Sequence, residues 1–290
     1  MLAAVTSLGG LVVLAAVLFG ELASERAWRA LAPSVRPAAA RRWCWRAAGA
    51  LLVVAVCAPV ANEALRSAWG EALQYGLVLF GAVPLAVLGA PAGLRWRSSR
   101  AETQRPVRRL PGHGWWSFGA FFLVMVGGRV PVVIGVLARY PSLVAAEVVV
   151  LVAGATPLWV DLVGSARWSA LEERPRRMLW AACGAWSTWI AAYVLGFSSH
   201  AWSPALARSS SLASVVQGQE VAAVMLWFLA ALSFLPVVFV NLTRWLGADD
   251  EPSGAVLAGA VTSERAMLGW QPLPPAPGEG AVPGPERAVR

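Results

Sequence analysis

Hydrophobic residues are concentrated in seven long runs, each close to the ~20 residues that a helix needs to cross the hydrocarbon core of a bilayer. The runs span about 2–20, 47–66, 70–91, 115–137, 143–164, 178–197 and 220–244. Only a short polar stretch separates the second run from the third, so these two should form a helical hairpin. The pattern therefore predicts an all-α polytopic membrane protein, a bundle of seven transmembrane helices.

Composition agrees with this interpretation. Hydrophobic residues make up 58% of the chain and charged residues 14%, whereas roughly a quarter of the residues of a soluble domain are charged. We therefore expect the lipid bilayer to be the main surrounding of residues 1–247. The final stretch, 248–290, is rich in Pro and Gly and lacks the apolar residues of a packed core, which predicts a disordered tail.

The arginines predict the direction of the helices in the membrane. The segments that follow the seven runs contain, in order, six, one, six, one, four, one and four Arg residues. Since cytoplasmic loops carry the excess of positive charge, this alternation places the N-terminus outside and the C-terminus in the cytoplasm, in the plasma membrane. The first run has no basic residues before it, which favours an uncleaved span. The net charge of +8 is explained by orientation, and we expect no nucleic-acid partner.

Polar residues recur at one depth in four of the predicted helices. With the predicted orientation, they lie in the outer half of the membrane, and we treat them as one outer polar cluster. Its members are Glu71, Gln74, Tyr75, Arg129, Glu147, Gln219 and Glu220. A charge at the centre of a membrane helix costs about 2.5–3.5 kcal/mol on insertion scales, so Arg129 should face the bundle and hold a carboxylate. Glu147 is the first candidate partner and Glu71 the second.

Three interpretations of this outer polar cluster remain open. It is an ion pair that locks helices together, a site for a cation, proton or ligand, or a set of interfacial residues without mutual contact. The three carboxylates exceed the single arginine, so the excess must be hydrated, protonated or matched by a cation.

The sequence contains no pattern that supports catalysis. Glycine-rich phosphate-binding motifs are absent, and no nucleophile lies at one depth with a histidine and an acid. His113 and His200 fall in loops on opposite sides of the membrane, and the three cysteines have no ligand spacing. We therefore predict that the protein is not an enzyme and holds no metal or other cofactor.

Several segments, in order along the chain, carry a family resemblance. They are EALQY followed by GLVLFGAVPLAVLGAP, then GRVP, and then GQEVAAVMLW. Together they resemble the CtaG family of assembly factors for caa-type cytochrome c oxidase. The resemblance covers roughly residues 25–247, and Gln74, Pro84 and Pro131 stand at matching positions.

The departures from the family pattern concern its histidines. The positions where relatives have His are occupied here by Glu71, Tyr75, Arg129, Leu143 and Glu147. Clustered histidines would suit copper on the outer side, whereas a central arginine repels a cation and carboxylates are poor ligands for Cu(I). The resemblance thus implies a diverged member in which an Arg–carboxylate network replaces the metal site.

The function implied by the resemblance is that of a membrane assembly or accessory factor for a haem-copper oxidase. Its expected partners are an oxidase subunit or a copper-delivery protein, besides the lipid bilayer. The alternative is a diverged membrane protein that binds or transports a small solute or cation at the outer polar cluster. A third interpretation is a purely structural partner within a membrane complex.

Overall fold

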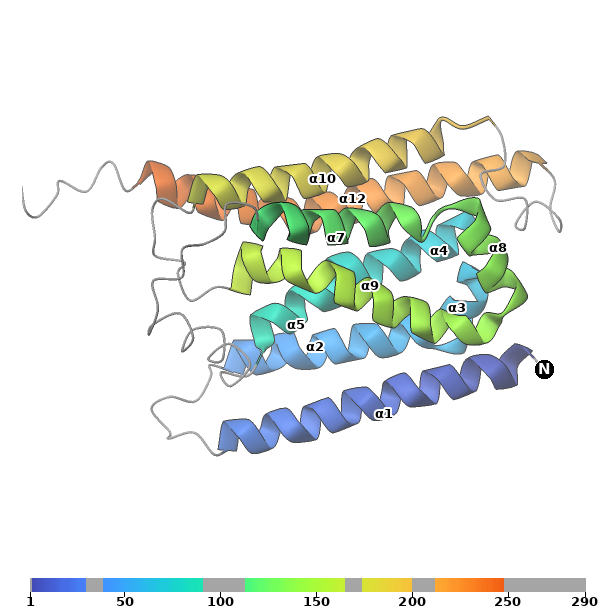
Figure 1. Cartoon of the computed structure of the whole chain (residues 1–290), viewed down its shortest axis with the longest axis horizontal. Coiled ribbons are helices and arrows are strands. Elements are labelled where there is room, and N and C mark those ends of the chain that lie inside the picture. The colour runs from blue at the N-terminus through green and yellow to red at the C-terminus, as the bar shows by residue number, and fades with distance from the viewer. Residues whose placement is uncertain (1, 30–38, 91–112, 165–173, 200–211, 248–290) are drawn as a thin grey trace, which may run out of the picture. The chain divides into compact units, whose positions relative to one another are not determined.

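Every secondary-structure element that the structure describes is a helix (Figure 1). The structure is a computed structural model, and it describes residues 2–29, 39–90, 113–164, 174–199 and 212–247. The stretch 248–290, for which the sequence predicts disorder, lies outside the described residues, as does His200. The helices belong to one compact unit, Met1–Trp245.

In chain order the helices are α1 (Leu2–Arg29), α2 (Ala39–Val56), α3 (Ala58–Ala64), α4 (Ala68–Tyr75), the π-helical segment η2 (Gly76–Ala82), α5 (Val83–Gly89), α7 (His113–Gly127), α8 (Pro131–Arg139), the 3₁₀ turn η3 (Pro141–Leu143), α9 (Val144–Trp159), the π-helical segment η4 (Val160–Gly164), α10 (Arg174–Gly196) and α12 (Leu212–Leu246). Two of the described breaks lie next to prolines, Pro59 at the start of α3 and Pro131 at the start of α8.

Four helical stretches in the described part of the chain are long and apolar enough to cross a membrane. They are Ala68–Gly89, Pro141–Val163, Arg174–Gly196 and Ala213–Leu246, and a fifth consists of α7 and α8 together, which are bent by 66° at their junction. The first two predicted runs are helical as α1 and as α2 with α3. The predicted hairpin between the second and third runs is confirmed, since α2 of the second run packs along η2 and α5 of the third.

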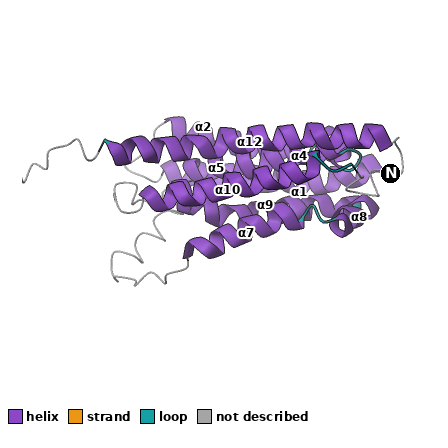
Figure 2. Ribbon diagram, turned by 90° about the horizontal axis from the view of Figure 1, so that it is seen from above, coloured by secondary structure: helices purple, strands orange, loops and turns teal. Residues whose placement is uncertain are grey.

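The described helices lie side by side (Figures 1 and 2). The main neighbours are α7 with α9, α2 with α5, and α1 with α2. In the interior, the Trp159 indole stacks on the Phe234 ring with centroids 4.9 Å apart, and Phe80 and Phe121 meet Phe234 edge to face. Many large apolar side chains, such as Leu123, Val224 and Phe228, remain exposed on the outside, as expected for helices surrounded by lipid.

Prolines within the helices leave backbone carbonyls without their usual donor, and side chains from neighbouring helices supply a replacement. α2 ends at Val56 and Cys57 is extended, so the Ala55 carbonyl lies in the last turn of α2 without an intrahelical donor. Pro59, four residues later in the first turn of α3, has no N–H to offer it. The Gln74 side chain, on α4, donates to that carbonyl at 2.9 Å. This buried hydrogen bond joins α4 to the C-terminal end of α2.

Pro84 has the same effect on the helix that contains η2. A proline at position 84 removes the donor that an α-helix would give the Phe80 carbonyl and a π-helix would give that of Leu79. Ser233 of α12 donates to the Phe80 carbonyl at 2.7 Å, and the Trp159 indole of α9 donates to the Leu79 carbonyl at 2.9 Å. Since lipid offers no hydrogen bonds, these contacts fix the centre of the bundle.

The bond from Gln74 gives a testable prediction. Gln74→Leu keeps much of the side-chain volume but leaves the buried Ala55 carbonyl without a partner, which should lower the free energy of unfolding by about 1–3 kcal/mol. Gln217→Leu is the matched control, because Gln217 is exposed on α12. Unfolding in mixed micelles measures both changes.

A second substitution checks the cause. Adding Pro59→Ala to Gln74→Leu returns a backbone N–H at the position that an unbroken helix would use for the Ala55 carbonyl, and part of the stability should return. Equal stability of the Gln74→Leu and Gln217→Leu proteins would show that the bond contributes little.

Candidate functional site

Arg129 lies at the break between α7 and α8, and Pro131 explains the break. Proline disfavours helical geometry in the residue before it, and Val130 is extended, with φ −64° and ψ 133°. The backbone N–H of Arg129 bonds to the Val126 carbonyl at 3.1 Å, which ends α7 with a tight turn. The Arg129 residue is only 9% exposed.

The two glutamates near Arg129 each lie in the first turn of a helix. Glu71 is in the first turn of α4, where Ser67 caps the helix by accepting a bond from the Gly70 N–H at 3.1 Å. Glu147 is in the first turn of α9. The positive end of the helix dipole favours a carboxylate at such positions. Figure 1 shows that α3, α4 and α8 lie at the same end of the bundle.

Four of the predicted cluster residues meet here. The Arg129 guanidinium forms an ion pair with Glu71, with Nε 3.8 Å from Oε1. The guanidinium carbon, Cζ, lies 4.7 Å from the centroid of the Tyr75 ring. The Tyr75 hydroxyl donates to Glu147 Oε1 at 2.9 Å. We call Glu71, Tyr75, Arg129 and Glu147 the buried ion network. Its contacts join α4, the α7–α8 junction and α9.

The partners of Arg129 differ in order from the sequence prediction. Glu147 was expected first, but the ion pair joins Arg129 to Glu71, and Glu147 accepts the hydrogen bond from Tyr75. The tyrosine ring lies under the guanidinium, an arrangement that is worth about 2 kcal/mol when the cation is removed from water. Sequence spacing places all these residues at one depth but does not say which side of each helix faces which neighbour.

Gly128 leaves the space that the Tyr75 side chain occupies. A Cβ at position 128 would collide with the Tyr75 hydroxyl and would lie 3.0 Å from its Cζ. Any larger residue would therefore push Tyr75 away from Glu147. The glycine next to Arg129 is thus part of the site, although sequence reasoning gave it no role.

Two cavities adjoin Glu71. The smaller is about 20 Å³, room for about one water molecule, and it lies between Glu71, Gln74 and Glu147. The larger is about 240 Å³ and is bounded by Glu71, Arg129 and Gln219 together with apolar side chains of α7, α8 and α10. The ion network therefore separates a space for water from a larger apolar one.

The other predicted cluster residues have different surroundings. Gln74 is buried and donates a hydrogen bond to the Ala55 carbonyl. Gln219 is 1% exposed and lines the larger cavity. Glu220 is exposed on α12, outside the buried ion network. Leu143, at a position where the family resemblance implies a histidine, is 41% exposed.

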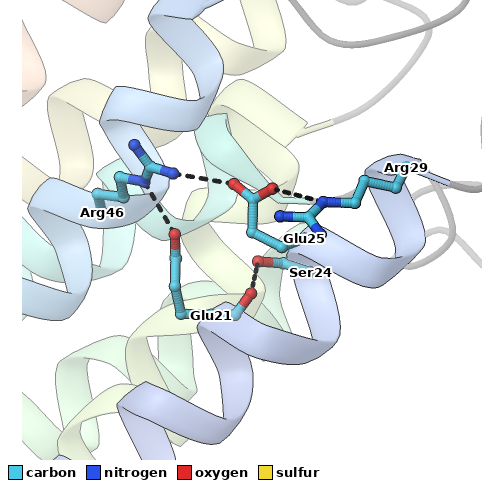
Figure 3. A network of polar contacts seen from close by, with 5 residues as sticks. All are labelled: Glu21, Ser24, Glu25, Arg29 and Arg46. Carbon is cyan, nitrogen blue, oxygen red and sulfur yellow. Dashed lines mark hydrogen bonds and ion pairs between the residues drawn. The ribbon is translucent and has the colours of Figure 1, made fainter.

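A second polar network was missed by the sequence analysis (Figure 3). Arg46 of α2 donates to Glu21 at 2.8 Å and to Glu25 at 2.9 Å, both on α1, and Arg29 lies 3.8 Å from Glu25. These side chains tie the C-terminal part of α1 to α2. The spacing of Glu21 and Glu25, one helical turn apart and followed by arginines, was the signal available in the sequence.

Among the described residues, no group of three or more His, Cys, Asp and Glu side chains is placed to hold a metal ion. The two carboxylates of the network, Glu71 and Glu147, are half-buried and lie beside the buried Tyr75 phenol and Arg129 guanidinium. A guanidinium carries only hydrogen-bond donors and cannot ligate a cation.

The partner assignment can be tested by substitution. Arg129→Met should lower the free energy of unfolding by about 3–5 kcal/mol, because it leaves a buried carboxylate without its counter-charge. Adding Glu71→Gln should recover more of this loss than adding Glu147→Gln. Unfolding measurements on both double variants decide between the partners, and greater recovery with Glu147→Gln would contradict the assignment.

Comparisons with known proteins identify the family. The family model for the cytochrome c oxidase caa3 assembly factor matches residues 8–248, which include nearly all of the described helices. Searches of curated proteins and of solved structures gave no significant match. Because the family model covers most of the chain, the protein belongs to the family of caa3-type cytochrome c oxidase assembly factors.

Proposed function

We propose that the protein is a membrane-embedded factor for the assembly of a haem-copper cytochrome c oxidase and that it acts without catalysing a reaction of its own. The observation that carries this proposal is the family match over residues 8–248, which extends through the helical unit. The ion network joins three helical segments by side-chain contacts, as expected of a scaffold.

The proposed arrangement has seven spans in the plasma membrane, with the N-terminus outside and the C-terminus in the cytoplasm. The alternation of arginine numbers between the runs supports it. In Figure 1 the start of α1 and the end of α12 lie at opposite ends of the bundle, which is consistent with an odd number of crossings. The buried ion network would then lie towards the outer face.

We further propose that this member has lost the metal site that the histidines of its relatives imply. The residues present do not fit copper: the Arg129 guanidinium would repel the ion, and Glu71 and Glu147 are hard ligands that Cu(I) disfavours. The ion network holds the helices together where relatives would hold a metal. The protein would then act through its helices on an oxidase subunit or on a copper-delivery protein.

The alternative function is the binding or transport of a small solute or cation at the outer polar cluster. The two cavities beside Glu71 favour it, since buried ionisable groups next to open space within a membrane protein often mark a pathway for a substrate or ion. Under this alternative the amount of assembled oxidase would not depend on the protein.

Deletion of the gene distinguishes the two functions. Under the assembly proposal, the deletion strain should lose most of its haem a absorbance and cytochrome c oxidase activity, and a plasmid copy of the gene should restore both. Membranes of the parent strain grown in parallel are the control. Unchanged oxidase spectra and activity in the deletion strain would refute the assembly role.

A further inference from the structure

The larger of the two cavities next to Glu71 is lined by residues of α4, α7, α8, α10 and α12. Its polar lining residues are Glu71, Arg129, Ser187 and Gln219, and its apolar wall includes Val126 and Ala191. The cavity volume of about 240 Å³ exceeds that of an engineered protein cavity of about 150 Å³ that binds benzene. A group of the size of one ring, with a short chain, therefore fits inside.

The cavity opens on the lipid-facing side of the bundle. Three of its lining side chains are also on the protein surface: Phe122 is 43% exposed, Ile190 59% and Val194 47%. Large apolar side chains exposed on membrane helices lie against hydrocarbon. A ligand would therefore reach the cavity from within the bilayer and would carry an apolar tail.

The polar wall sets the chemistry of the head group. Arg129 and Glu71 form an ion pair, so their charges largely cancel and a neutral ligand is favoured. The Glu71 Oε1 atom is buried and accepts no hydrogen bond from any described group. The Ser187 hydroxyl, also on the wall, donates to the Gly184 carbonyl at 3.0 Å, which leaves its oxygen to accept. Both oxygens call for a ligand that donates.

We propose that this cavity binds a neutral, membrane-dissolved amphiphile whose head is a ring-sized group bearing a hydroxyl. The hydroxyl donates to Glu71, and the ring and tail lie against Phe122, Val126 and Ile190. A hydrocarbon without a hydroxyl would leave the buried Glu71 Oε1 atom in its ion pair with Arg129 but without a hydrogen bond, which is costly in an apolar site. This site is additional to the assembly role and does not depend on it.

The test uses radiolabelled 4-hexylphenol and the purified full chain in phosphatidylcholine nanodiscs, with empty nanodiscs as background. One saturable site per chain is expected. Unlabelled 4-hexylphenol should displace the label, whereas 4-hexylanisole, whose methyl ether cannot donate, should compete at least about tenfold less well, since a hydrogen bond to a charged group is worth about 1.5–3 kcal/mol.

Variants locate the site. Ala191→Trp fills the cavity from α10 and should abolish saturable binding, whereas Val224→Trp adds the same side chain at an exposed position of α12, 69% exposed, and should leave binding unchanged. Equal competition by 4-hexylanisole, or no saturable site in the unmodified protein, would overturn the proposal without any variant having to fold. Full binding by Ala191→Trp would overturn the location.

Discussion

Lipid offers no hydrogen bonds and little stabilisation for charge, so the polar groups inside this bundle must be matched by one another. Near Pro59 and Pro84, backbone carbonyls lack a donor from their own helix. The side chains of Gln74, Trp159 and Ser233, on neighbouring helices, donate hydrogen bonds to these carbonyls. The same constraint acts on Arg129, which is paired with Glu71 and covered by the Tyr75 ring. Packing of α4, α7, α9 and α12 thus depends on polar contacts that cross between helices.

Much of the fold followed from the sequence because hydrophobic runs and helix breakers are local signals. The helical class and the hairpin of the second and third runs, which are α2 with α3 and α4 with η2 and α5, were predicted in this way. The family resemblance was confirmed by the match over residues 8–248. The π-helical segment η2 was not predicted. It depends on how the helix accommodates Pro84 against α9 and α12, which is a property of packing and not of local sequence.

The sequence predicted which residues form the candidate site more accurately than which of them contact one another. Depth along the helices predicted that Glu71, Tyr75, Arg129 and Glu147 lie together. The rotation of each helix about its axis decides that Glu71 forms the ion pair with Arg129 and that Tyr75 donates its hydrogen bond to Glu147. Gly128 was missed because its close approach to Tyr75 is visible only in three dimensions. The second polar network, formed by Glu21, Glu25 and Arg46, was missed as well. Glu220 was included on depth alone, although it is exposed on α12 and no described contact joins it to the buried ion network.

We propose that an internal ion network stands in this chain where the family resemblance implies a metal site. Copper analysis of the purified protein, after incubation with Cu(I) and removal of excess metal by a competing chelator, tests it most directly. The account predicts far less than one copper per chain, with an Arg129→Met protein no better at retaining the metal. One tightly held copper per chain would contradict the account.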